Sequence, residues 1–151
     1  MATWKDVEDA APELAARARR ILDAHKHKTV ATLRADGAPR ISGIECTFID
    51  GELTFGSMPG ARKGADLHRD ARFALHSASV DPPEGDEAVW PGDAKVAGRA
   101  VYVGQLAGPP DGDLFRADVG EVVVTRLTED ATALLIETWT PGRGLRRIER
   151  A

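Results

Sequence analysis

Residues 28–56 read "KTVATLRADGAPRISGIECTFIDGELTFG", and this stretch decides the fold. Its first eight residues are rich in β-branched side chains and alternate in polarity, which is typical of a strand with one buried face. "DG" follows at 36–37 and again at 50–51, and this dipeptide is a strong hairpin signal because Asp and Gly accept the backbone conformation of tight turns. The pattern therefore predicts an antiparallel meander of three strands: 28–35, 39–49 and 52–56.

The residues before the meander predict a helical N-terminal arm over 1–26. Thr3 and Asp6 suit the capping box of a short first helix, and Pro12 suits the first position of a second helix. Five residues of the second segment recur at helical spacing: Leu14, Ala18, Ile21, Leu22 and His25.

The residues after the meander predict more strands than helices. We expect a helix at 63–70, a strand at 72–79, a Pro- and Gly-rich loop at 80–93, a long strand at 94–106, a short helix at 109–115, strands at 121–128 and 132–139, and a basic tail at 140–151. Gly98, inside the long strand, predicts a bulge or a close backbone approach. About seven strands with few helices favour a mainly β (α+β) fold, a small closed or nearly closed barrel. We interpret 1–151 as one domain, with barrel strands within 28–106 and 119–150.

Composition limits the expected partners and compartment. The 151 residues are 42% hydrophobic and 29% charged, with a formal net charge of -4, as in ordinary soluble proteins. A mild negative charge gives no reason to expect nucleic acid or a membrane surface, and no apolar run approaches the roughly 20 residues of a membrane span. Cys46 is the only cysteine, so no intrachain disulfide can form and we expect a cytoplasmic protein.

Several classes of chemistry lack their motifs. The sequence has no "GxSxG" element and no recognisable order of a catalytic triad, and Cys46 lies within a predicted strand, where we expect a packed and unreactive thiol. The histidines show no "HxxxH" spacing and "CxxC" is absent, so no metal site is expected. No "GxGxxG" follows a strand, which argues against a Rossmann-type dinucleotide site. We therefore expect no catalytic side chain and no metal.

The remaining signal is a pair of cations, Arg62 and Lys63, where a predicted helix begins. Helix starts ordinarily favour Asp, Glu or Ser, because their free N–H groups carry partial positive charge. One interpretation is a solvated surface pair; the other, which we favour, is a phosphate cradle of two cations and free N–H groups. The small residues Gly60 and Ala61 would let the phosphate approach, and Arg40 opens the neighbouring strand.

The runs 31–77 ("ATLRADGAPRISGIECTFIDGELTFGSMPGARKGADLHRDARFALHS") and 92–100 ("GDAKVAGRA") resemble the pyridoxamine 5'-phosphate oxidase-like family of FMN-binding split β-barrels, most of all its small actinobacterial members. The resemblance covers nearly the whole chain. It implies a split β-barrel with a helical N-terminal arm and short connecting helices. It also implies a homodimer with cofactor sites in clefts at the interface, the cofactor being FMN or, alternatively, the deazaflavin F420.

The resemblance also assigns cofactor-binding roles by position. Arg40, Arg62 and Lys63 would hold the phosphate. Along the ring system and at the phosphate end would lie Ile41, Ser42, Gly43, Ser57 and Met58. The ending "ETWTPGRGLRRIER" resembles the C-terminal Trp and spaced arginines of the oxidase, so Trp139, Arg147 and Arg150 would reach the cofactor or substrate.

We therefore interpret the chain as a flavin- or deazaflavin-dependent oxidoreductase that moves hydride between the bound cofactor and a small organic substrate, chemistry that the cofactor itself supplies. The alternative is a non-catalytic carrier of flavin, F420 or haem, or an interaction domain with an empty cleft. The tail "GLRRIER" lacks the family's His, and Glu45 and Asp93 stand where the oxidase has Lys and Gln. These departures argue against the oxidase's own reaction.

Overall fold

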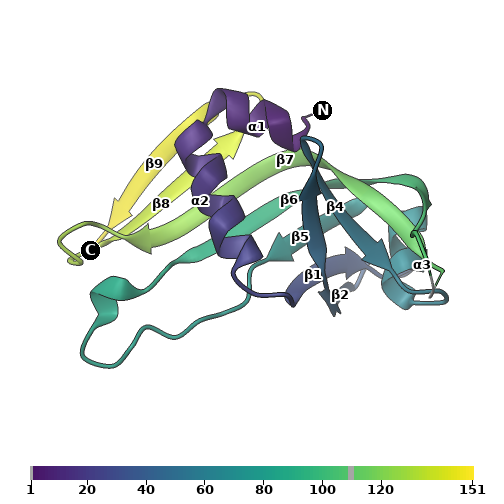
Figure 1. Ribbon diagram of the computed structural model, residues 1–151, viewed down its shortest axis with the longest axis horizontal. Coiled ribbons are helices and arrows are strands. Elements are labelled where there is room, and N and C mark those ends of the chain that lie inside the picture. The colour runs from purple at the N-terminus through teal and green to yellow at the C-terminus, as the bar shows by residue number, and fades with distance from the viewer. Residues whose placement is uncertain (1, 109–110) are drawn as a thin grey trace.

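The computed structural model describes residues 2–108 and 111–151. All of its strands belong to one antiparallel sheet (Figure 1). The helical elements are α1 (Trp4–Ala10), α2 (Pro12–Asp23), α3 (Arg62–Arg69) and the 3-10 turn η1 (Glu87–Val89). The strands are β1 (Lys28–Leu33), β2 (Pro39–Ile44), β3 (Cys46–Ile49), β4 (Glu52–Ser57), β5 (Arg72–His76), β6 (Asp93–Gln105), β7 (Asp113–Leu127), β8 (Leu134–Thr140) and β9 (Gly144–Arg150).

The order of the strands explains why the sheet is a split barrel. It runs β2-β1-β5-β6-β7-β4-β3, and β8 and β9 continue from the second half of β7. The first and last strands of this path, β2 and β3, are joined through the single residue Glu45. The sheet must therefore curl until its two ends meet, although no ladder among the described residues joins β2 to β3. This arrangement confirms the predicted mainly β split-barrel fold.

The predicted three-stranded meander is wrong at its middle strand. Both "DG" hairpins form, β1 with β2 and β3 with β4. Residues 39–49, however, break at Glu45 into two strands at opposite ends of the sheet path. Ile44, Cys46 and Phe48 keep the same in-and-out alternation across the break, since Ile44 and Phe48 are buried and Cys46 is half-buried. A period of two reports which face is buried, and it cannot report that the chain changes partner strand.

The short helix predicted for 109–115 is also wrong where the structure describes it; residues 109 and 110 lie outside the described residues. β7 begins at Asp113, earlier than the predicted start at Glu121, and its first residues pair with β4 on one side and β6 on the other. Ladders on both sides satisfy more backbone groups than one helical turn can, so they outweigh the turn-like composition of the segment. The predicted irregularity at Gly98 is confirmed: the register of β6 and β7 shifts there, and a Cβ would collide with the Asp118 carbonyl oxygen.

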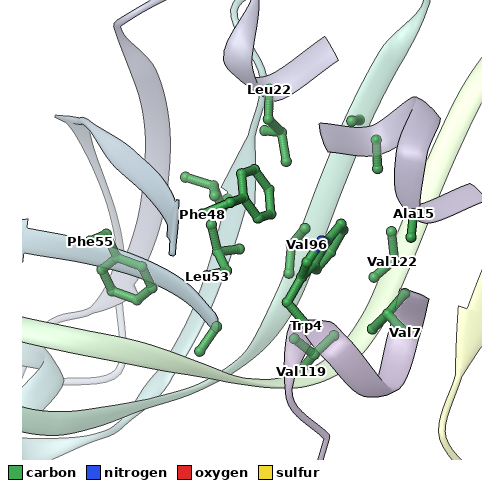
Figure 2. Packing of buried hydrophobic residues seen from close by; sticks show 14 of the residues in the cluster. Trp4, Val7, Ala15, Leu22, Phe48, Leu53, Phe55, Val96, Val119 and Val122 are labelled. Atoms are coloured by element: carbon green, nitrogen blue, oxygen red, sulfur yellow. The ribbon is translucent and has the colours of Figure 1, made fainter. Parts of the chain in front are cut away.

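The helical arm covers one side of the sheet (Figure 1). Its start follows the predicted capping box: Asp6 N donates to Thr3 Oγ1 at 3.1 Å, and Thr3 N donates to Asp6 Oδ2 at 2.9 Å. Pro12 opens α2, as predicted. Trp4 lies among Phe48, Val96 and Val119 (Figure 2), with its ring centroid 4.8 Å from that of Phe48. The arm therefore fills the barrel interior at this end.

The tail forms β9, which pairs with β8 along its whole length. The sequence predicted only a basic tail over 140–151, and the structure shows that most of it is a strand of the sheet. Within the described residues, no helix has the length and apolar character that crossing a membrane requires.

Candidate functional site

A cleft of about 510 Å³ opens at the split of the barrel. One wall comes from the corner between β2 and β3: Gly43, Ile44, Glu45 and Thr47. β4 supplies the floor with Thr54, Phe55 and Gly56. The remaining lining residues come from the segment before β1, from the region of α3 and from the β6–β7 hairpin: His27, Met58, Lys63, Leu106 and Leu114. Residues from distant parts of the sequence thus line one cavity, because the strand order of the barrel brings them together.

Two glycines shape this cleft. A Cβ added at Gly43 would have no heavy atom within 4 Å, so the backbone of β2 is open to the cavity there. A Cβ added at Gly56 would lie 2.9 Å from a methyl carbon of Leu106, so Leu106 packs directly on the β4 backbone. A ligand in the cleft can therefore approach the backbone of β2, while Leu106 covers that of β4.

Lys63 stands at the end of the cleft, in the first turn of α3. Its Nζ donates to the Gly43 carbonyl oxygen at 2.9 Å. Ala61 caps this helix with an extended backbone and no side-chain hydrogen bond, and the first turn has no acidic residue. The helix start that the sequence predicted is confirmed, with Arg62 exposed beside it. Positive charge and uncapped N–H groups are concentrated at this point.

Arg40, the third predicted phosphate ligand, is held by a buried carboxylate. Its Nε donates to Asp66 Oδ2 at 2.7 Å, and the Asp66 side chain is only 3% exposed. Thr32 Oγ1 donates to the same oxygen at 2.7 Å, and Arg69 Nη2 donates to Asp66 Oδ1 at 2.9 Å. Burial raises the pKa of Asp66, but the hydrogen bonds from Arg40, Thr32 and Arg69 outweigh it and lower the pKa to about 2. Asp66 thereby ties α3 to β1 and β2.

The other predicted residues near this end differ in exposure. Ile41 is 76% exposed and Ser42 is half-buried, two residues and one residue before Gly43 on β2. Met58 is exposed and lines the cleft. Ser57 is buried under α3, because a Cβ on Gly64 would lie only 2.5 Å from Ser57 Oγ. The structure thus brings Gly43, Met58 and Lys63 into the cleft, with Arg40, Ser57 and Arg62 around its α3 end.

Trp139 and Arg147 lie elsewhere in the chain. Trp139 is 5% exposed and belongs to the hydrophobic core, where its strand position faces Val122 and Leu145. Arg147 Nε donates to Glu137 Oε2 at 3.0 Å. Neither residue lines the cleft of its own chain. Their contact with the cofactor or substrate, with that of Arg150, stays a prediction.

Sequence reasoning missed His27 as a cleft residue and noted Glu45 only as a departure from the family. His27 Nδ1 lies 3.9 Å from Glu45 Oε1, and Lys26 Nζ lies 3.7 Å from the same oxygen. The segment before β1, which holds Lys26 and His27, meets Glu45 at the corner where β2 ends and β3 begins. No spacing in the sequence signals that corner, so local pattern alone could not have found them.

Metal and thiol chemistry have no further support in the part of the chain that the structure describes. It holds no group of three or more His, Cys, Asp or Glu side chains placed to bind a metal ion. Burial raises the pKa of the Cys46 thiol, an effect that the neighbouring Lys28 partly offsets. A raised pKa keeps the thiol protonated and makes it a poor nucleophile.

The fold and the cleft define a class of protein: a split β-barrel with a cation-bearing helix start beside an open pocket. Residues 14–126, about three quarters of the chain, match the family model described as pyridoxamine 5'-phosphate oxidase, and the chain belongs to this family. The resemblance drawn from the sequence is thereby confirmed. No curated protein matches the chain.

Solved structures resemble the chain over most of its length. An FMN-binding protein of Nostoc punctiforme, related to pyridoxamine 5'-phosphate oxidase, has a TM-score of 0.61 at 12% identity, with 100% of this chain and 98% of that one covered. PhzG of Burkholderia lata has a TM-score of 0.61 at 15% identity, covering 97% and 87%. A haem-binding protein of Mycobacterium smegmatis has a TM-score of 0.55 at 14% identity, covering 91% and 88%. At these identities the likeness shows the fold alone.

Proposed function

We propose that the chain binds FMN in the cleft at the barrel split and acts as an oxidoreductase on a small organic substrate. The observation that carries the proposal is Lys63 at the uncapped start of α3, at one end of a cavity whose other walls are largely apolar. A phosphate suits the first feature and a flat ring system suits the second.

The residues present fit the cofactor at its phosphate end. Lys63 now donates to a neutral carbonyl oxygen, and an ionised phosphate oxygen is a stronger acceptor. Arg40 is fixed through Nε by Asp66, so its guanidinium is already oriented and loses little freedom on binding a phosphate. Arg62 is exposed at the same helix start and adds a third positive charge.

The residues also fit at the ring end. Ile44, Phe55, Leu106 and Leu114 give apolar contact surfaces, and Gly43 leaves backbone open to the cavity. A volume of about 510 Å³ falls within the usual range for a small-molecule site.

A bound flavin would supply the hydride chemistry. The residues of this chain would bind the phosphate, orient the ring against Gly43 and exclude water with Leu106 and Leu114. His27 and Glu45 border the cleft and are placed to contact a substrate. We assign no catalytic side chain.

A titration tests the proposal. We expect the purified apoprotein to quench the fluorescence of added FMN with a saturable curve and a 1:1 stoichiometry per chain. F420 and haem are titrated in parallel, because the deazaflavin is the alternative cofactor and one structurally similar protein is described as haem-binding. Binding of haem or F420 without FMN would replace the flavin proposal with the carrier or deazaflavin alternative, and binding of none would favour an interaction domain.

We also propose a homodimer, as the family resemblance implies. The exposed Ile41 and Ile148, 76% and 55% exposed, are apolar side chains on strands of the sheet that a partner could cover. Light scattering at micromolar concentration should give twice the mass of the 16.2 kDa chain. A monomer that still binds the cofactor would contradict the proposal.

A further inference from the structure

A second hollow, separate from the cleft, lies between α2, the η1 segment and the end of β7. Its volume is about 480 Å³, and none of its lining residues lines the first cleft. Arg17, Arg20, Ile21 and Ala24 reach it from α2, where their spacing places them along one face of the helix. The hollow therefore has a rigid helical wall.

The charge of this hollow is opposite to that of the whole chain. Arg17, Arg20 and Arg126 line it, and Glu129 is the one carboxylate among its described lining residues. The chain as a whole carries a net charge of -4. In the part of the chain that the structure describes, Arg17 and Arg20 form no ion pair, whereas the intervening Arg19 lies 3.5 Å from Asp23. Two cations thus line the hollow with no ion-pair partner among the described residues.

Arg126 is held in place by a buried carboxylate. Its Nε donates to Glu137 Oε1 at 3.0 Å, and the Glu137 side chain is 5% exposed. Arg147 donates to the other oxygen of Glu137. Two arginines share one carboxylate, so this cluster keeps a positive charge, and Arg126 is fixed as a lining residue of the hollow.

The hollow also has apolar lining residues, one of which is held in place by a hydrogen bond. Trp90 is half-buried, and its indole Nε1 donates to the Val80 carbonyl oxygen at 2.8 Å, which fixes the orientation of the ring. Pro91 and Leu127 line the hollow beside it. An indole and arginines that line the same hollow are suited to a ligand that is flat and apolar at one end and anionic at the other.

We propose that this hollow binds a small organic anion with a flat apolar body, of the aromatic carboxylate class. Its carboxylate lies between the guanidinium groups of Arg17, Arg20 and Arg126, and its ring packs on Trp90. Two simpler explanations exist for these cations: surface arginines are ordinarily solvated, and Arg20 interacts favourably with the C-terminal end of α2. Each explains one arginine by itself, but neither explains why the arginines line a cavity together with Trp90. The site is independent of the proposed flavin cleft.

The test uses the full-length protein and 2-naphthoate as the probe, with the neutral 2-naphthamide as the matched ligand. We expect calorimetry to give a Kd for naphthoate below about 1 mM and at least roughly tenfold weaker binding of the amide, because the amide cannot form charge-assisted hydrogen bonds. Naphthoate should also change the tryptophan fluorescence. That change should disappear in Trp90→Phe, because Trp4 and Trp139 are buried in the core.

Variants assign the binding to this hollow. Arg17→Gln/Arg20→Gln should weaken naphthoate binding by roughly tenfold or more. Arg34→Gln/Arg99→Gln removes the same charge from exposed positions outside the hollow and should leave it unchanged, as should Lys63→Ala in the first cleft. If the double variant does not fold, Arg20→Gln alone is used for the same test, because Arg20 is exposed and its replacement should not disturb the fold. Equal binding of acid and amide, no binding up to about 10 mM, or insensitivity to the arginine variants would each overturn the proposal.

Discussion

Two regions of the molecule are each built around a buried carboxylate that receives hydrogen bonds from two arginines. Asp66 on α3 receives Arg40 and Arg69, and Glu137 on β8 receives Arg126 and Arg147. The carboxylate side chains are 3% and 5% exposed. Burying a carboxylate is costly unless it is paired and hydrogen-bonded, so both clusters are primarily structural.

The two regions differ in what surrounds the cluster. Beside Asp66, the start of α3 adds Lys63, whose partner is the neutral Gly43 carbonyl oxygen and which lines the cleft. Beside Glu137, Trp139 points into the core and β9 completes the sheet. The family resemblance assigned a residue of each region, Arg40 and Arg147, to the cofactor. The difference teaches that Lys63, whose partner is a neutral carbonyl oxygen, keeps its full positive charge for a ligand, whereas an arginine bound to a buried carboxylate is first of all a structural group.

The largest expected effect is on stability, from Asp66→Asn. Arg40 is 16% exposed and would be left without its counter-charge, so we expect the free energy of unfolding to fall by about 3 kcal/mol in urea denaturation. Glu137→Gln should cost less, about 2 kcal/mol, because Arg147 is 56% exposed and can be solvated. Asp70→Asn, which removes an ion pair with the 62% exposed Arg72, is the control and should cost less than about 1 kcal/mol. An equal loss of unfolding free energy in Asp66→Asn and Asp70→Asn would show that the buried ion pair contributes no more to stability than the surface pair.

The second effect is on affinity. Lys63→Ala should weaken FMN binding by about one to two orders of magnitude, because one charge-assisted hydrogen bond to the phosphate is lost. The free energy of unfolding should change by less than about 0.5 kcal/mol, since the bond from Lys63 to Gly43 is exposed. Lys95→Ala, at an exposed position of β6, is the matched control. A variant that loses stability and still binds FMN like the wild type would end the phosphate-cradle interpretation.

The loss of stability in acid should distinguish the buried Asp66 cluster from ordinary surface ion pairs. The pKa of Asp66 is about 2 in the folded protein against an ordinary value of 3.8, so the unfolded chain binds this proton more readily. The stabilisation by Asp66 is therefore fully present above about pH 4 and is lost as the pH falls toward 2. Unfolding free energies measured from pH 5 to pH 2 should fall more steeply in the wild type than in Asp66→Asn. Parallel curves would show that Asp66 does not carry this acid sensitivity.

The smallest expected effect tests the tail. The Arg147 side chain is 56% exposed beyond its contact with Glu137, so its terminal nitrogens remain accessible to a ligand. If the role assigned by the family resemblance holds, Arg147→Ala should weaken FMN binding roughly threefold to tenfold, less than Lys63→Ala. Arg146→Ala, the neighbouring exposed arginine, is the control. Unchanged affinity would make Arg147 a structural partner of Glu137 and sharpen the contrast between the two regions.

Features set by neighbouring residues were predictable from the sequence. The "DG" dipeptides give hairpins, with Gly37 and Gly51 at φ of 86° and 76°, and Thr3 with Asp6 gives the capping box. The start of a helix at Arg62 and Lys63 was predictable for the same reason. The interactions that form these features join residues a few positions apart, so their energies depend little on the rest of the chain.

Partner strands and cavities were decided by the tertiary structure. Glu45 gave no sign that β2 and β3 would end on opposite sides of the sheet, and the tail gave no sign that β9 would pair with β8. The sequence by itself determined that Arg40 is a cation at the start of a strand and Lys63 a cation at the start of a helix. Only the fold decided that Arg40 meets Asp66, 26 positions away, while Lys63 meets a backbone carbonyl and the open cleft. Such pairings depend on which distant segments pack together to bury the core, and that is a property of the whole chain.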